Sequence, residues 1–151
     1  MNKTELTEYL RSLAVGCEVN EGKQFAEITV PADLLHGIAL SLRKDEKTSL
    51  DFLVSITGFD YGQDLGAIYH LRSSKYDHTI VLRVLTNDRE NPHFDSVTDI
   101  WRSADFLERE VYDLLGIKFT NHPDLRRLFL DKSWGFPLRK DYTNDEKIVT
   151  K

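Results

Sequence analysis

The feature that most constrains this chain is a helical pattern that ends at a glycine and precedes a long stretch without periodicity. Apolar residues recur at spacings of four, three, four and three, at Ile100, Ala104, Leu107, Val111 and Leu114. This spacing predicts one buried stripe on a helix, and Gly116 follows where a helix commonly ends in a left-handed residue. Residues 117–151 carry charges and aromatic side chains without a helical or strand period. We therefore predict an α+β domain over residues 1–116 and an extended arm over residues 117–151, which is not a separate domain.

Composition narrows the class of protein. The 151 residues are 40% hydrophobic and 30% charged, as in an ordinary globular domain with a core. A net charge of −5 argues against general nucleic-acid binding, which uses basic faces. Cys17 is the one cysteine, so neither a disulfide framework nor a cysteine-based metal cluster is expected. The first residues do not resemble an export signal, and no apolar run approaches the ~20 residues that cross a bilayer.

The region before the third helix reads as alternating helices and strands. The expected elements are a helix capped by Thr4, a strand over residues 25–30, a helix beginning at Pro31, and strands over residues 50–56, 67–71 and 79–85. The connection 73–78 predicts an antiparallel hairpin, and the glycines of 58–66 predict a turn-rich excursion. Ser96 and Asp99 have the spacing of a capping box, so we expect the third helix to begin there. This order predicts an α+β two-layer sandwich, with helices on one face of a mixed sheet.

Three acids on the third helix are the first candidates for chemistry: Glu108, Glu110 and Asp113. On a helix Glu108 points roughly 160° away from Glu110 at about 100° per residue, so the three cannot converge on one ion. We therefore favour a structural or interface role for them. The alternative is a stand-alone metal-dependent hydrolase that uses Glu108, Glu110 and His122. No HExxH, GxSxG, GxGxxG or GxxxxGK[ST] motif occurs, so zinc-protease, nucleophilic and nucleotide-binding sites are unsupported.

The arm combines basic doublets with aromatic residues. The doublets are Arg126-Arg127 and Arg139-Lys140, and beside them lie Phe129, Trp134, Phe136 and Tyr142. Such a mixture is found in single-strand nucleic-acid sites, but four aspartates of the same segment nearly cancel the charge. Arginine and aromatic residues are also enriched in protein–protein hot spots. The arm can fold back over its own domain, contact a partner, or do both.

Separated motifs occur here in a recognisable order. The central one is Glu108-Arg109-Glu110, followed by Asp113, Leu114-Leu115, His122 and Arg126-Arg127-Leu128. Residues 50–61 and 96–101 precede it, and residues 135–142 (GFPLRKDY) follow it. Together they resemble the 30-kilodalton subunit of respiratory complex I, which is the C-type subunit of bacterial NADH:quinone oxidoreductase. The chain departs from that pattern at Asp131, where a proline is usual, and by one missing residue between Trp134 and Gly135.

The resemblance implies a non-catalytic peripheral-arm subunit of proton-translocating NADH:quinone oxidoreductase. It would sit on the 49-kilodalton subunit, which is the D-type subunit, and near the iron–sulfur subunits, and would hold no cofactor or metal of its own. NADH, FMN, the iron–sulfur clusters and quinone would belong to other subunits. Its expected location is peripheral, on the cytoplasmic face of a bacterial inner membrane or the matrix side of a mitochondrial one. The same role in a membrane-bound hydrogenase or a ferredoxin- or F420-dependent quinone reductase is the alternative.

Motif position and composition also suggest a partner interface. Its expected members are Glu108, Arg109, Glu110, Asp113, His122, Arg126, Arg127, Trp134, Phe136, Leu138, Arg139, Lys140, Asp141 and Tyr142. The arginines, lysine and aspartate would supply charged contacts, and the aromatic residues and leucine would supply apolar anchors.

Overall fold

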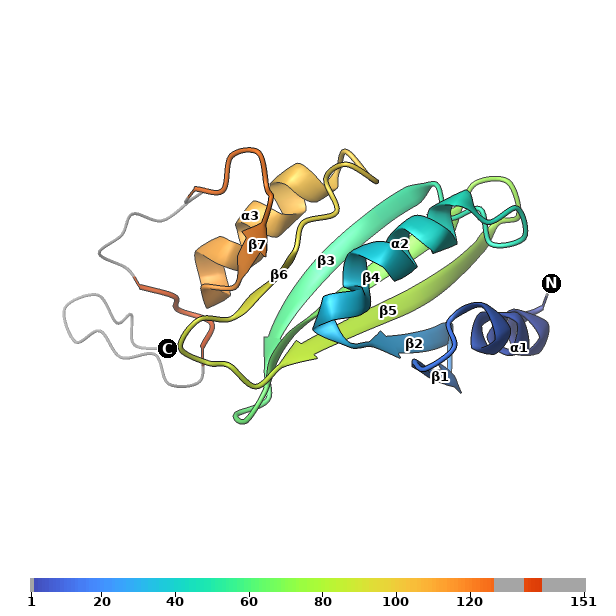
Figure 1. Cartoon of the computed structure of the whole chain (residues 1–151), viewed down its shortest axis with the longest axis horizontal. Helices are drawn as coiled ribbons and strands as arrows, with labels where there is room; N and C mark the ends of the chain where they lie inside the picture. The colour runs from blue at the N-terminus through green and yellow to red at the C-terminus, as the bar shows by residue number, and fades with distance from the viewer. Residues whose placement is uncertain (1, 127–134, 140–151) are drawn as a thin grey trace.

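A mixed sheet of five strands lies at the centre of the fold (Figure 1). The structure is a computed structural model, and the residues it describes are 2–126 and 135–139. The strands are β1 (Glu18–Glu21), β2 (Ala26–Val30), β3 (Phe52–Asp60), β4 (Leu65–Ser73) and β5 (His78–Thr86). Their order in the sheet is β1–β2–β5–β4–β3, with β2 and β5 parallel and the other neighbours antiparallel. The hairpin expected across residues 73–78 is thereby confirmed.

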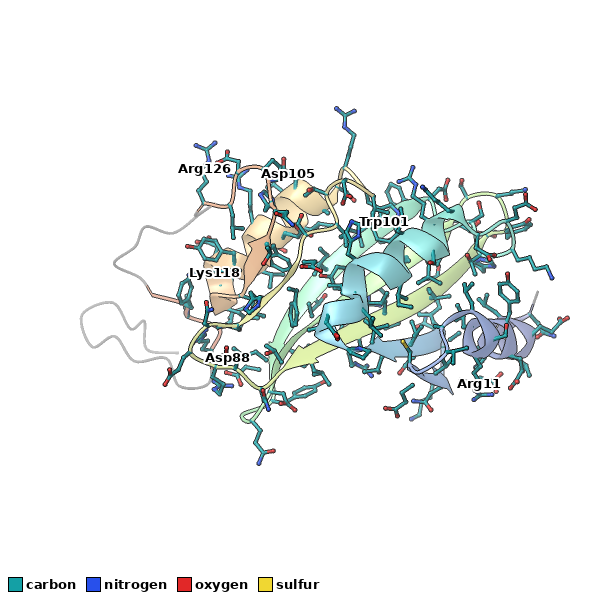
Figure 2. All side chains as sticks on the ribbon, in the orientation of Figure 1. Arg11, Asp88, Trp101, Asp105, Lys118 and Arg126 are labelled. Atoms are coloured by element: carbon teal, nitrogen blue, oxygen red, sulfur yellow. The ribbon has the colours of Figure 1, made fainter. Side chains whose placement is uncertain are left out.

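Three helices bury their apolar sides in one core with this sheet. They are α1 (Lys3–Leu13), α2 (Leu35–Lys44), which follows the short 3-10 helix η1 (Ala32–Leu34), and α3 (Ala104–Leu115). In Figure 1, α2 crosses in front of the sheet and α3 lies beside β3. Side chains fill the space between these layers, where Trp101 is buried and donates its indole N–H to the Leu50 carbonyl at 2.9 Å (Figure 2). The predicted α+β sandwich is confirmed.

The alternation of β2 shows which face of the sheet meets the helices. Its first, third and fifth residues are buried, and they lie opposite the buried Ile80, Leu82 and Val84 of β5. Because successive strand residues point to opposite faces, these residues define the core face. Glu27 and Arg83 lie on the other face, where their side chains approach to 3.6 Å.

The start of α3 differs from the prediction. The helix begins at Ala104, and Ser96 and Asp99 do not form a capping box. Ser96 instead donates its hydroxyl to Glu108, and Asp99 pairs with His36 at 2.8 Å. Residues 96–103 are a loop because Glu108, which is fully buried, takes polar partners from that segment.

The buried face of α3 is also rotated relative to the predicted stripe. The buried residues of α3 are Ala104, Glu108, Val111, Asp113 and Leu115, whereas Leu107 and Leu114 are half-buried. Apolar periodicity locates the helix, but it counts only apolar residues and therefore cannot identify a buried carboxylate such as Glu108. For this reason the prediction chose the neighbouring leucines. Gly116 is the left-handed C-cap, at φ 76°, as predicted.

The N-cap of the first helix lies two residues before the predicted one. Asn2 caps α1 and forms a reciprocal capping box with Glu5, while the Thr4 hydroxyl contacts Glu21. The short β1, which the sequence did not predict, runs beside β2. Four-residue strands give too little alternation to be recognised from sequence.

The glycines between residues 58 and 66 lie mostly in strands, contrary to the predicted excursion. β3 continues to Asp60, β4 begins at Leu65, and only residues 61–64 form the turn. A Cβ on Gly58 would lie 2.3 Å from Leu115, and one on Gly66 would lie 2.3 Å from Phe59. These glycines therefore permit close packing rather than chain reversal.

The beginning of the predicted arm packs with the domain. Residues Lys118–Thr120 form β7, which pairs in parallel with β6 (His93–Asp95) in a second sheet. Ile117 and Phe119 are buried in the core. Residues 117–120 thus pack with the domain, which the sequence could not show because a three-residue strand has no visible period. The division of the chain into a domain and an arm stays a prediction.

Gly116→Ala should be more destabilising than Gly62→Ala. Both glycines have positive φ, which costs an alanine about 1–2 kcal/mol. A Cβ on Gly116 would also lie 2.6 Å from the Phe136 ring, adding roughly 1–3 kcal/mol of overpacking, whereas one on Gly62 meets nothing within 4 Å. Urea denaturation of both variants measures the difference. Equal losses would show that residues 135–139 do not pack against the end of α3.

Candidate functional site

The best-defined polar centre of the charged motif is the carboxylate of Glu108. It lies in the middle of α3 with 0% exposure, and accepts hydrogen bonds from the Ser96 hydroxyl at 2.7 Å and the Val97 N–H at 2.8 Å. Burial raises its pKa to about 7, against the lowering effect of these two bonds, and nearby Asp105 and Asp99 raise it further. Glu108 thus attaches the loop of residues 96–103 to the helix.

Glu110 and Asp113 lie elsewhere around the helix. Glu110 is half-buried beside β3, in a groove that also includes Thr57 and Gly58, while Asp113 is fully buried. Arg109, between them, is half-buried. Glu108 and Glu110 therefore lie in different surroundings, as their predicted separation of roughly 160° around the helix implies.

His122 is engaged at the first turn of α3. Its Nε2 lies 3.0 Å from the Asp105 carbonyl, and its Nδ1 accepts from the Asp124 N–H at 2.9 Å, so Nε2 carries the proton. Glu108, Glu110 and His122, the candidate hydrolase residues, are not brought together. Over residues 2–126 and 135–139, no three histidine, cysteine or acidic side chains gather in a way that could hold a metal ion.

Residues 135–139 return to the C-terminal end of α3. The Leu138 N–H donates to the Leu114 carbonyl at 3.0 Å, and Arg139 Nε donates to the Leu115 carbonyl at 2.6 Å. The Phe136 ring packs 5.9 Å from Tyr112, centre to centre. A helix end leaves carbonyls without partners and carries partial negative charge, so a guanidinium there satisfies both demands.

The same arginine connects α3 to the end of β3. Arg139 Nη1 donates to the Arg89 carbonyl at 3.1 Å, and Arg89 forms a two-pronged ion pair with Asp60 at 2.7 and 2.8 Å. The Asp60 side chain is only 2% exposed. Arg139, predicted to contact a partner, therefore also holds its own chain together.

The remaining predicted interface residues divide by location. Leu138 is 57% exposed, and Arg126 is exposed and pairs with Asp124 at 3.2 Å. Five of the predicted residues lie outside those that the structure describes: Arg127, Trp134, Lys140, Asp141 and Tyr142. For these, partner contact stays a prediction.

Sequence reasoning missed exposed apolar side chains on β3. Phe52 is 54% exposed and Val54 is 48% exposed, although both lie in a strand. The sequence pointed the other way, because Phe52 and Val54 alternate with Asp51 and Ser55 and so suggest an inward-facing apolar row. The β-bulge between Leu53 and Ser55 breaks that alternation, and Leu53 is buried instead.

These features define a class of protein, an α+β domain in which Glu108 and Arg139 hold the domain's own helix and loop. It leaves apolar side chains exposed along one strand. Among the described helices, none is long and apolar enough to cross a membrane.

Comparison with known proteins identifies the family. Residues 28–147 match the family described as respiratory-chain NADH dehydrogenase, 30 Kd subunit. The chain belongs to this family, which confirms the resemblance drawn from its motifs.

Relatives named as C-type or C/D-type subunits of NADH-quinone oxidoreductase support this assignment. The C/D-type subunit of Phocaeicola vulgatus is 47% identical over 82% of this chain, which spans 25% of that protein. The C-type subunit of Moorella thermoacetica is 40% identical over 88% of this chain and 90% of its own length. The chain thus spans about a quarter of the C/D-type relatives and most of a separate C-type relative.

A solved structure shows the same fold. It is described as the membrane-bound sulfane sulfur reductase, an archaeal respiratory membrane complex, and one of its chains matches with a TM-score of 0.81. The match covers 95% of this chain and 86% of that chain at 20% identity, so it establishes the fold alone.

Glu108→Gln should remove a pH dependence of stability. Because the folded-state pKa is raised from 4.5 to about 7, its contribution to stability is full below about pH 4.5 and is lost as pH rises to about 7, by roughly 3 kcal/mol. A glutamine can accept from the Val97 N–H and donate to Ser96 without titrating. Urea denaturation between pH 5 and 8 should therefore show the variant gaining stability relative to wild type as pH rises. Glu110→Gln is the matched control and should keep the wild-type slope; a parallel slope for Glu108→Gln would refute the prediction.

Arg139→Ala should lower the free energy of unfolding by about 1–2 kcal/mol, since it removes two charge-assisted hydrogen bonds at the end of α3. Arg139→Lys, which keeps the charge but not the forked geometry, should fall between Arg139→Ala and wild type. Arg126→Ala removes an exposed ion pair and should change stability by less than about 0.5 kcal/mol. Thermal and urea denaturation compare the three. Equal effects of Arg139→Ala and Arg126→Ala would contradict the internal role of Arg139.

Proposed function

We propose that this chain is a non-catalytic peripheral-arm subunit of a proton-translocating NADH:quinone oxidoreductase and that it docks on the 49-kilodalton subunit, the D-type subunit. One observation carries the proposal. In the relatives from Phocaeicola vulgatus and Bacteroides thetaiotaomicron, 47% and 45% identical, the matching segment is about a quarter of a chain named as a C/D-type subunit. Two subunits joined in one polypeptide are held at high effective concentration, which favours contact between them. A separate C-type subunit would make the same contact in trans.

In this role the chain binds and positions its neighbours, while NADH, FMN, the iron–sulfur clusters and quinone belong to other subunits. Its single cysteine cannot supply the thiolates that hold a cluster. Two of its charged residues, Glu108 and Arg139, are engaged within the chain. Attachment to the cytoplasmic face of the inner membrane, or to the matrix side in mitochondria, would be indirect, through the complex.

The same subunit role in another respiratory complex is the second candidate. The fold shared with a chain of the sulfane sulfur reductase complex supports this second candidate. Hydrogenases and ferredoxin- or F420-dependent quinone reductases belong to the same candidate. The relatives at 40–47% identity carry the name NADH-quinone oxidoreductase, so NADH is the favoured electron donor.

Affinity purification tests this proposal. A tagged chain recovered from gently solubilised native membranes should bring with it the D-type subunit, cluster-carrying subunits and the NADH-oxidising flavoprotein, as read by mass spectrometry. The same neighbours with a hydrogenase or ferredoxin-oxidising module would keep the role and change the donor. Recovery of the chain without a D-type subunit would contradict the docking.

A further inference from the structure

β3 is the end strand of the main sheet and has one open edge. It pairs with β4 alone, through eight of its nine residues, and in the described part of the chain no strand lies along its other side. An open edge presents unpaired N–H and C=O groups and invites pairing with another chain. Proteins commonly protect such edges with lysine or proline, and β3, which reads FLVSITGFD, contains neither.

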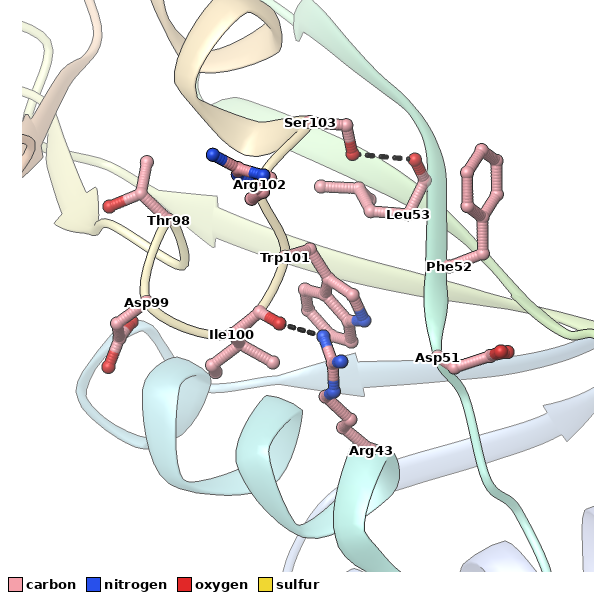
Figure 3. A pocket seen from close by; sticks show the side chains of 10 residues that line it. All are labelled: Arg43, Asp51, Phe52, Leu53, Thr98, Asp99, Ile100, Trp101, Arg102 and Ser103. Carbon is pink, nitrogen blue, oxygen red and sulfur yellow. Dashed lines mark hydrogen bonds between the residues drawn. The ribbon is translucent and has the colours of Figure 1, made fainter.

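Two hydrogen bonds show which residues of β3 point toward the open edge. Near its start, the Leu53 carbonyl points away from β4 and accepts from the Ser103 hydroxyl at 2.9 Å (Figure 3). At the other end, the Tyr61 N–H donates to the Asp64 carbonyl at 2.9 Å across the hairpin, so position 61 faces β4. In an antiparallel pair successive residues alternate between the two directions. Counting back from Tyr61 places the N–H and C=O of Gly58 and Ile56 at the open edge.

The count from Leu53 gives the same answer. The register of β3 against β4 shifts by one residue between Leu53 and Ser55, a β-bulge. With that extra residue included, the edge-facing positions after Leu53 are again Ile56 and Gly58. The backbone direction is therefore supported from both ends of the strand.

An apolar groove runs along this part of the edge. It has a volume of about 140 Å³ and lies between β3 and α3, lined by Ile56, Thr57, Gly58, Glu110, Val111, Leu114, Leu115 and Leu138. Leu114 is half-buried and Leu138 is 57% exposed, so apolar surface is left uncovered above the edge. Phe52 belongs to the opposite face of β3, because it pairs with Arg72 whereas Ile56 and Gly58 pair with the buried Tyr69 and Ala67. Val54, which is 48% exposed, lies in the bulge next to this part of the edge.

Charge along the edge is concentrated at one position. Near the start of β3, a depression of about 340 Å³ is lined by two basic and two acidic side chains, Arg43, Arg102, Asp51 and Asp99, which balance one another, and the exposed Phe52 points away from Trp101 there (Figure 3). The groove farther along contains Glu110 as its one charged lining residue. A complementary segment would carry a basic residue toward Glu110 and apolar side chains along the rest of the groove.

We propose that an extended segment of the D-type subunit pairs as an additional strand with the open edge of β3 and places apolar side chains in the groove beneath α3. This inference rests on the proposed function, which supplies the partner. Backbone pairing with Ile56 and Gly58 gives affinity, and the apolar groove and Glu110 give specificity.

Amide hydrogen exchange of the full chain, alone and bound to the D-type subunit of the same organism, tests the pairing. The Ile56 and Gly58 amides should exchange readily in the chain alone and at least roughly tenfold more slowly in the complex. The Thr57 and Phe59 amides, which face β4, should be protected in both states. A stable complex without added protection at Ile56 and Gly58 would overturn this inference and leave the proposed function intact. Absence of any complex would overturn the proposed function, and this inference with it.

Two surface variants provide an independent test. Val54→Lys and Leu138→Lys replace exposed side chains, so each should keep the wild-type melting temperature and weaken binding of the D-type subunit roughly tenfold or more. The control is Val15→Lys, at an 82% exposed position after α1 and far along the chain from β3, which should bind as wild type. Wild-type affinity for both β3-edge variants would contradict the proposed docking surface.

Discussion

The buried carboxylate of Glu108 is the constraint on which much of the structure depends. A carboxyl group inside a core is unfavourable unless it is neutral or hydrogen-bonded, and here Ser96 and Val97 supply the hydrogen bonds. To supply them, the segment before α3 must fold back over the helix instead of extending it. That loop then places Trp101 beside Leu50 and Ser103 beside Leu53, so one buried acid determines how α3 sits against β3.

The other end of α3 is held by a second polar arrangement. Arg139 donates hydrogen bonds to the last carbonyl of the helix and to the Arg89 carbonyl. Arg89 in turn forms an ion pair with the buried Asp60 at the end of β3. Gly116 lets the chain turn and leaves room for the Phe136 ring. Glu108 thus holds α3 at its middle and Arg139 holds it at its end, although the sequence motifs suggested a partner interface for both residues.

The division between residues that stabilise the domain and surface suited to a partner therefore differs from the one that the sequence motifs suggested. Charged residues of the family motif stabilise the domain, whereas the surface suited to a partner is the apolar edge of β3 with Leu138 beside it. This division suits a subunit whose proposed role is to bind and position its neighbours. A rigid helix and strand can present an edge with little loss of conformational entropy on binding. The opposite face of the sheet bears the Glu27–Arg83 ion pair.

Sequence alone determined the family, the α+β class and the position of most elements, because alternation in β2, the short hairpin and the glycine after α3 are local signals. It could not determine where α3 begins, since Ser96 has the spacing of a cap and is instead a partner of Glu108, twelve residues away. Nor could it show that Gly58 is a packing position or that residues 118–120 form a strand. The sequence also supplied the candidate residues of the site, but tertiary structure decided which of them face inward. The physical reason is that burial of a charge, close approach at a glycine and pairing of short strands depend on residues that are distant in the chain.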